Sequence, residues 1–162
     1  MTLAESGLFD LVLGLPQHPL VVHAVVVLLP LTALVEIAVA LQPRWNRAWG
    51  VWVVVALFLL TGATFVAKES GEALAARIGQ GAVTETGHLE LGSRLPIVAG
   101  VLFLLAAVLW WLDRRTGRNG VRTTLTKIVA VVTVLAALVT VVQVVRVGDS
   151  GARAVWGFVA DQ

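Results

Sequence analysis

The sequence has no cysteine, and its single methionine is Met1. The absence of cysteine excludes disulfide bonds, thiolate metal sites, iron–sulfur clusters and the covalent attachment of c-type haem. The absence of any further methionine excludes a thioether copper site. Histidine, carboxylate, hydroxyl and backbone groups are the ligands that remain.

Charged residues are also scarce. They make up 14% of the 162 residues, whereas hydrophobic residues make up 58% and the mean hydropathy is +0.90. About a quarter of the residues of a soluble domain are charged, so this composition indicates an integral membrane protein surrounded by the lipid bilayer. The net charge is only +2, which gives no reason to expect a nucleic-acid partner.

Motifs of known catalytic machinery are missing too. The sequence has no G-x-S-x-G, no P-loop and no glycine-rich dinucleotide turn in a suitable context. The GDSG at 148–151 resembles a protease nucleophile loop, but it follows an apolar run in a chain with no predicted soluble domain. Asp149 and Ser150 are therefore interpreted as helix-capping groups. Whether the protein is an enzyme stays open.

Four apolar runs approach or exceed the roughly 20 residues that cross a hydrocarbon core. They cover about 19–42, 48–67, 91–112 and 123–146. Short connections join the first run to the second and the third to the fourth, which predicts an all-α membrane four-helix bundle of two antiparallel hairpins. We expect one domain over 1–162 with an outer loop at 68–90. The hairpins look only loosely alike, so no internal repeat is predicted.

The two short connections are the basic ones. Their arginines are Arg44, Arg47, Arg114, Arg115, Arg118 and Arg122. Because positive charge stays in the cytoplasm, both short connections should face inward, with the outer loop and both termini outside the plasma membrane. Glu5 and Asp10 precede the first run without any Lys or Arg, unlike a signal peptide, so this run is expected to be a retained helix.

Polar groups gather at the outer end under this topology. They are His18, His23, Glu69, His88, Gln143, Arg146 and Asp149. Ionisable residues at the ends of membrane spans indicate a site. The simpler alternative is a solvated rim, because every bundle has polar ends.

The histidine spacing favours one kind of site. His18 and His23 are five residues apart, about 140° around a helix, and so form a poor chelating pair. His23 lies a turn inside its span and should face protein or a cavity rather than lipid, at a depth similar to that of His88. Two imidazoles facing each other from different helices suit axial ligation of haem b, and Gly92 beside His88 would let a flat macrocycle approach the backbone.

Two alternatives to haem remain. A zinc or copper ion would use His18, His23, His88, Glu69 and Asp149. The other alternative is that no cofactor is bound.

Glu36 lies deeper in the first span, roughly 26 Å along the helix from its start. Its carboxylate is interpreted as reaching toward Arg44, Arg47 or Arg115 at the inner boundary. The alternative is one end of a proton path.

Four motifs carry a resemblance to a known family. LPQHPLVVHAVVVLLPL, SG after the second span, GHLELG before the third and GDSGARAVW after the fourth follow one another along the chain. In these motifs the sequence resembles the bacterial DUF2231 family of small four-helix membrane proteins. The resemblance implies the four-helix membrane fold and its topology, but it implies little about biochemical activity. Relatives often have Phe-Pro where Ala24 and Val25 stand, and many have histidine where this chain has Asp149.

Three classes of function follow. The first is a redox module that binds haem b through His23 and His88 and relays electrons to a quinone or an extracytoplasmic redox protein. The second is a carrier or sensor of a metal ion or small ligand at the outer rim. The third is a non-catalytic membrane subunit whose outer loops dock a partner. The sequence favours the first slightly and does not predict the oligomeric state.

Overall fold

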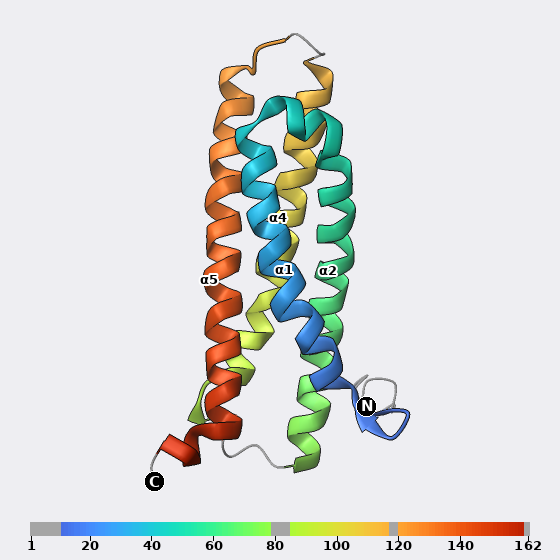
Figure 1. The fold of residues 1–162 in the computed structure, drawn as a ribbon, viewed down its shortest axis with the longest axis vertical. Coiled ribbons are helices and arrows are strands. Elements are labelled where there is room, and N and C mark those ends of the chain that lie inside the picture. The colour runs from blue at the N-terminus through green and yellow to red at the C-terminus, as the bar shows by residue number, and fades with distance from the viewer. Residues whose placement is uncertain (1–10, 79–84, 117–119, 161–162) are drawn as a thin grey trace.

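The computed structural model describes residues 11–78, 85–116 and 120–160, and most of them lie in four long helices (Figure 1). These helices are α1 (Gln17–Leu41), α2 (Pro43–Ile78), α4 (His88–Arg115) and α5 (Thr124–Ala160). Each contains a segment long and apolar enough to cross a membrane. The predicted all-α membrane four-helix bundle is therefore confirmed.

The bundle consists of two antiparallel hairpins, α1–α2 and α4–α5. A single residue, Gln42, separates α1 from α2, and its N–H donates to the Val39 carbonyl at 3.2 Å. Pro43 occupies the first position of α2, where a missing N–H costs no helical hydrogen bond. The connection is consequently shorter than the five residues, 43–47, that separate the first two predicted spans.

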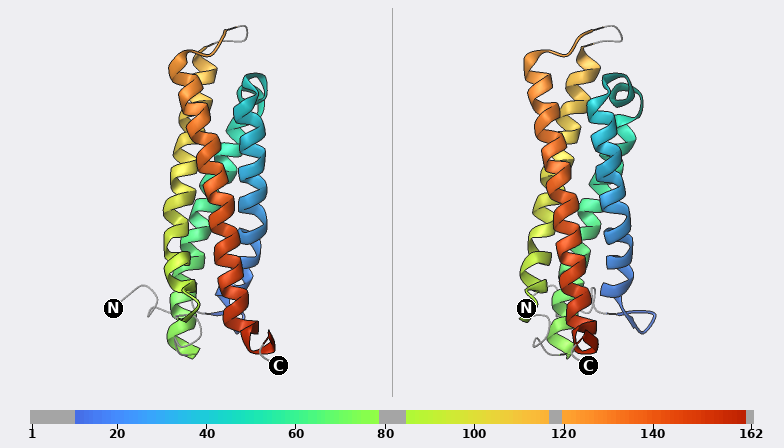
Figure 2. Two further views of the ribbon diagram at one scale, coloured as in Figure 1. Left: turned by 90° about the vertical axis from the view of Figure 1, so that its left-hand side faces the viewer. Right: turned by 60° about the vertical axis from the view of Figure 1, so that its left-hand side comes forward.

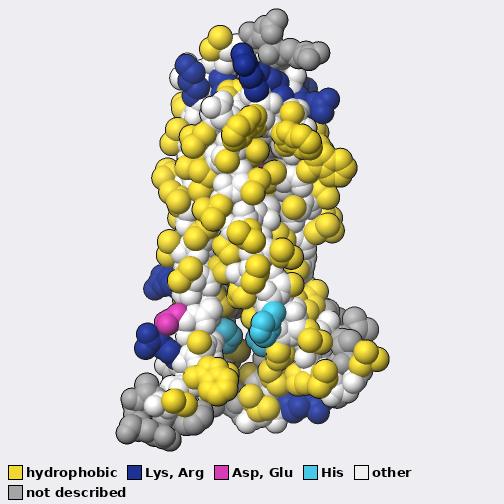
Figure 3. Space-filling model, in the orientation of Figure 1, with side chains coloured by type: hydrophobic (Ala, Val, Ile, Leu, Met, Phe, Trp, Pro, Cys, Tyr) yellow, Lys and Arg dark blue, Asp and Glu magenta, His cyan; other side chains and the backbone are white. Residues whose placement is uncertain are grey.

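The four helices form a closed ring. Both α1 and α4 pack against α2 and α5, while α1 and α4 themselves lie across a diagonal and touch little (Figures 1 and 2). We name the two ends by their side chains. The histidine end holds the starts of α1 and α4, and the arginine end holds the starts of α2 and α5. Lysine and arginine gather at the arginine end, above a broad apolar band (Figure 3).

The buried residues of α2 and α5 repeat at alternating steps of three and four. In α5 they are Thr126, Ala130, Thr133, Ala137, Thr140, Val144 and Val147. In α2 they are Asn46, Gly50, Val53, Leu57, Leu60, Thr64 and Ala67. Steps of three and four give the 3.5-residue period of helices that pack with a small left-handed crossing angle. Most of these side chains are small, which lets helix backbones approach closely in a membrane.

The two hairpins share a repeated pattern of buried positions that was not predicted from the sequence. Each buried position of α2 from Asn46 to Ser70 has a buried counterpart in α5 eighty residues later, from Thr126 to Ser150. The likeness is hard to read in the sequence because the paired residues differ in kind, with Leu57 matched by Ala137. What repeats is the spacing of buried positions, which fixes the same packing in both hairpins.

Helices α2 and α5 continue beyond the predicted spans. The outer loop expected at 68–90 is helical as far as Ile78, and α5 runs on to Ala160. Ala73 and Ala75 are still buried, so this part of α2 keeps a packing partner. A helix of this length extends about 54 Å, well beyond a hydrocarbon core of about 30 Å.

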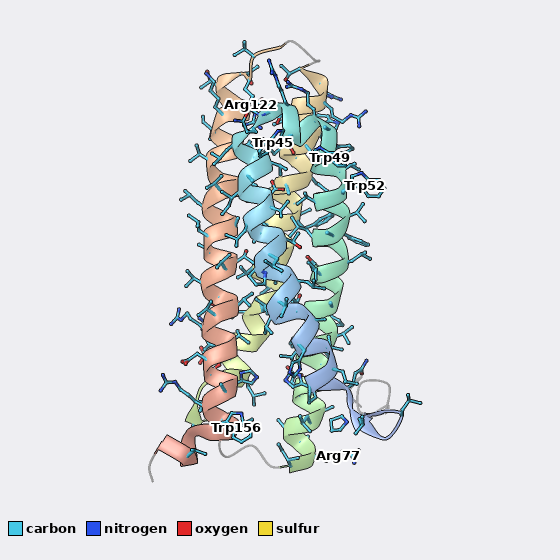
Figure 4. The ribbon with its side chains drawn as sticks, in the orientation of Figure 1. Trp45, Trp49, Trp52, Arg77, Arg122 and Trp156 are labelled. Atoms are coloured by element: carbon cyan, nitrogen blue, oxygen red, sulfur yellow. The ribbon has the colours of Figure 1, made fainter. Side chains whose placement is uncertain are left out.

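Tryptophans mark both ends of the apolar band. Trp45, Trp49 and Trp52 project from α2 near the arginine end, and Trp156 from α5 near the histidine end (Figure 4). Such exposed indoles are typical of membrane–water interfaces. Trp110 differs from the others because it is half-buried and packs beside Gly50.

A two-residue hairpin precedes α1. Strands β1 (Leu11–Val12) and β2 (Leu15–Pro16) pair antiparallel. The turn residues Leu13 and Gly14 have φ of 52° and 82°, as a tight hairpin turn of this type requires.

Candidate functional site

Two imidazoles face each other at the histidine end. His18 comes from the first turn of α1 and His88 from the start of α4, the two helices that lie across the diagonal. Their ring centroids are 6.1 Å apart, and the rings are nearly perpendicular, with an interplanar angle of 80°. His88 follows His18 by seventy residues, and the buried Leu95 follows the buried Val25 by the same number. The two histidines therefore occupy equivalent positions in the two hairpins.

The hydrogen bonds of these two rings determine where their protons lie. His18 Nδ1 donates to the Ala67 carbonyl at 2.9 Å, and His88 Nδ1 donates to the Val147 carbonyl at 3.2 Å. A carbonyl oxygen only accepts, so each Nδ1 carries a hydrogen. In a neutral imidazole this leaves the lone pair on Nε2. In this tautomer each ring can accept a hydrogen bond or bind a metal only through Nε2.

Beside each ring, the neighbouring helix carries a matching Ser-Gly pair, and Ser150 Oγ also lies 3.1 Å from His88 Nδ1. Ser70 donates to the Ala67 carbonyl at 3.1 Å, and Ser150 donates to the Val147 carbonyl at 2.9 Å. A Cβ on Gly71 would lie 2.8 Å from His18 Cε1, and a Cβ on Gly151 would lie 2.9 Å from His88 Cε1. Glycine is therefore needed at both positions for the imidazoles to pack against the helix backbones.

A mostly apolar cavity of about 430 Å³ surrounds the two rings. All four helices line it, with many small residues. Figure 3 shows histidine side chains beside a hollow near this end of the molecule. The volume falls within the range of small-molecule sites, about 300–1,000 Å³.

His23 does not take the place expected from the sequence. Its side chain is exposed and borders the cavity, and its Nδ1 hydrogen-bonds to the Pro19 carbonyl of its own helix. Pro19 is tolerated in the first turn, so α1 already includes His18. Because the two histidines lie about 140° apart on that helix, the inward direction of His18 turns His23 outward. His18, rather than His23, faces His88.

The remaining residues of the predicted rim do not converge on the histidines. Glu69 forms an ion pair with Lys68 at 2.9 Å, and Asp149 forms one with Arg153 at 2.9 Å. Gln143 donates to the Leu91 carbonyl at 2.9 Å and so ties α5 to α4.

The other two predicted positions differ in their surroundings. Arg146 is exposed, whereas Gly92 is half-buried and lines the cavity. The residues that the structure describes include no group of three or more His, Asp or Glu side chains that could hold a metal ion. The five-residue ligand set expected for zinc or copper is therefore not assembled.

A second polar cluster, at the arginine end, was not predicted. Asp113 is fully buried and accepts hydrogen bonds from the Asn46 amide at 2.7 Å and from Arg122 Nε at 2.8 Å, with a second contact to Arg122 Nη2. Arg122 also donates to the Ala40 carbonyl at 2.5 Å. Asp113 ends a run of apolar residues beside Arg114 and Arg115, so the sequence suggests an ordinary solvated helix end.

Glu36 belongs to the same end and points inward. It is buried, and no described residue or backbone group hydrogen-bonds to its Oε1. The expected reach toward Arg44, Arg47 or Arg115 is not observed, because Glu36 lies on the face of α1 that packs inside the bundle, with Ala33 and Ala40.

Comparison with known proteins gives one match. The model of a family described as "Predicted membrane protein (DUF2231)" matches residues 14–161. No curated protein and no solved structure matches the chain. The matched range includes all four helices and both histidine–glycine contacts. The chain therefore belongs to the DUF2231 family of membrane proteins.

Proposed function

We propose that this protein is a membrane redox module that binds one haem b between His18 and His88. The observation that carries the proposal is the facing pair of imidazoles, each oriented by an Nδ1–H bond to a backbone carbonyl. Metal-binding histidines usually donate their second nitrogen in this way, which fixes the tautomer and the ring orientation.

The separation of the rings suits a metal between them. An imidazole nitrogen binds a metal at about 2 Å and the ring centre lies about 1 Å behind it, so two histidines that held one metal would have their ring centres about 6 Å apart or closer. The His18 and His88 ring centroids are 6.1 Å apart. This separation would allow His18 and His88 to hold one iron atom between them.

The number of protein ligands favours haem over a bare ion. Zinc in a structural site takes four ligands from the protein, and the described part of the chain brings only two histidines together here. A porphyrin would supply most of the iron ligands itself, and His18 and His88 would supply the ligands that the protein has to provide. The mostly apolar, glycine-lined cavity also suits a flat hydrophobic ring.

The proposed place of this module is the plasma membrane, with the arginine end in the cytoplasm and both termini outside. The histidine site would then lie near the extracytoplasmic surface. The chemistry that such a group supplies there is one-electron transfer between the membrane quinone pool and an extracytoplasmic redox protein. His18 and His88 would hold the iron, while Gly71 and Gly151 leave room for the two rings.

The test is an ultraviolet–visible spectrum of the detergent-purified full chain, oxidised and dithionite-reduced, together with iron analysis. We expect a sharp Soret band and about one iron per chain. His18→Ala and His88→Ala should each abolish the band, whereas His23→Ala should retain it, because His23 is exposed.

Glycine variants provide a matched second test. Gly71→Ala would push a methyl group onto the His18 ring and should weaken haem binding, while Gly62→Ala in the same helix has open space and should not. A protein that stays colourless after haemin is offered would overturn the proposal and leave a structural role for the histidines. Equal loss of the band in His23→Ala would overturn the assignment of His18.

A further inference from the structure

A second hollow, separate from the histidine cavity, opens at the arginine end. It has a volume of about 1130 Å³ and lies between the α1–α2 connection and the segment that leads into α5. Four cationic side chains line it, namely Arg44, Arg47, Arg122 and Lys127. Among the described residues that line it none is acidic, so this lining carries a net positive charge.

The charges in this basic pocket differ in what they already contact. Arg122 is occupied by Asp113 and by the Ala40 carbonyl, so it forms a fixed part of the wall. Arg44 and Lys127 are exposed, and neither makes an ion pair with another residue that the structure describes. These two side chains are available to a ligand that carries negative charge.

Backbone groups add to the same field. Helices α2 and α5 both begin at the arginine end, at Pro43 and Thr124, and neither has an acidic residue in its first turn. The N-terminus of a long helix carries about half a positive charge and unpaired N–H groups. The pocket thus combines side-chain cations with two helix N-termini whose charge no acidic residue offsets.

Apolar groups stand beside these charges. Leu41 and Val121 line the pocket and are 65% and 81% exposed. Trp45, next to Arg44, is also exposed, and Figure 4 shows it with Arg122 near the arginine end of the bundle. Charged and apolar contacts at one membrane boundary are what an anionic lipid headgroup and its attached chains would meet.

We propose that this basic pocket binds a phosphate group, presented by an anionic membrane lipid or by a soluble phosphate compound. Lysine and arginine are the side chains that recognise phosphate, arginine through its fork of N–H donors and lysine as a point charge. Arg44 and Lys127 contact the phosphate, and Arg122, held by Asp113, shapes the wall behind it. The proposal is independent of haem binding.

The test compares the full chain with Arg44→Gln/Lys127→Gln in two arms. One arm measures retention of phosphatidylglycerol against phosphatidylcholine by native mass spectrometry. The other measures binding of inorganic phosphate and glycerol phosphate by calorimetry in neutral detergent. Each basic residue near an anionic headgroup contributes about 5-fold in affinity, so the double variant should bind about 25-fold more weakly.

The control is Arg94→Gln/Arg153→Gln, which removes the same charge from exposed positions at the histidine end. It should bind as the wild type does. If the Arg44/Lys127 variant loses lipid binding, the pocket is a lipid site. If it loses binding of the soluble phosphates, the pocket is a site for a soluble phosphate compound. Equal binding by wild type and the Arg44/Lys127 variant in both arms, or an equal loss in the control, would overturn the proposal.

Discussion

Asp113 is the most completely enclosed acid of the described chain, and its surroundings explain how a membrane bundle tolerates it. Its side chain is 0% exposed and that of its partner Arg122 is 9% exposed. Two nitrogens of Arg122 and the amide of Asn46 satisfy the carboxylate oxygens. Removing one partner of such a pair leaves an uncompensated charge, which costs more than the pair itself contributes.

This argument predicts the effect of breaking the pair. Asp113→Asn should lower the free energy of unfolding by about 3–5 kcal/mol, because Arg122 loses its counter-charge. The double variant Asp113→Asn/Arg122→Gln should lose less free energy of unfolding than the two single variants lose together, because no charge is then left without its partner. Thermal unfolding in detergent measures both.

A surface pair provides the comparison. Arg153→Gln breaks the exposed ion pair with Asp149 at the other end of the bundle and should leave the unfolding temperature unchanged. Equal effects of Asp113→Asn and Arg153→Gln would mean that the buried pair is not the source of stability.

The four helices pack through small residues at regular intervals. Threonine, although polar, fits this pattern because Thr133 and Thr140 each donate to a carbonyl of their own helix at 2.8 Å. Their hydroxyls are satisfied before any tertiary contact forms. Thr133 and Thr140 are fully buried, so extra volume at this face of α5 should be poorly tolerated.

A size change inside the bundle tests this packing. Ala137→Leu, at a position that is 0% exposed, should lower the free energy of unfolding by about 1–3 kcal/mol through overpacking. Leu138→Ala, one residue away and 48% exposed, should stay within about 0.5 kcal/mol of the wild type. Thermal unfolding in one detergent compares the two variants, and a larger loss for Leu138→Ala would contradict the described rotation of α5.

The whole molecule has two chemically different ends. Lysine and arginine without acidic side chains on the visible face gather at one end, whereas the other end holds histidines together with charges of both signs, and an apolar band lies between them (Figure 3). The described chain enters at Leu11 and leaves at Ala160 on the histidine side (Figures 1 and 2). The distribution of arginine predicts that this side faces away from the cytoplasm.

The lack of cysteine makes this orientation easy to measure. Ile78→Cys places a single thiol at the histidine end, and Val121→Cys places one at the arginine end, at positions that are 68% and 81% exposed. A membrane-impermeant maleimide added to intact cells should label only Ile78→Cys. In permeabilised cells both variants should be labelled. Labelling of Val121→Cys alone in intact cells would show that the orientation is the opposite of the predicted one.

The number of helices and the class of fold could be predicted from the sequence because they depend on local properties. Runs of apolar residues and the positions of Pro43 and the arginines are readable one segment at a time. The lengths of α2 and α5 were less predictable. The segment 68–78 contains charges that suggest a loop, yet Ala73 and Ala75 bury a face there and keep the helix intact.

The sequence by itself determined that this protein is a membrane bundle with all three histidines at one end and the arginine-rich short connections at the other. Only the tertiary structure decided which of those residues meet. The rotation of a helix about its axis depends on its neighbours, and an apolar helix with little amphipathic character does not reveal that rotation. Packing alone therefore turns His18 toward His88, turns His23 outward, and encloses Glu36 and Asp113.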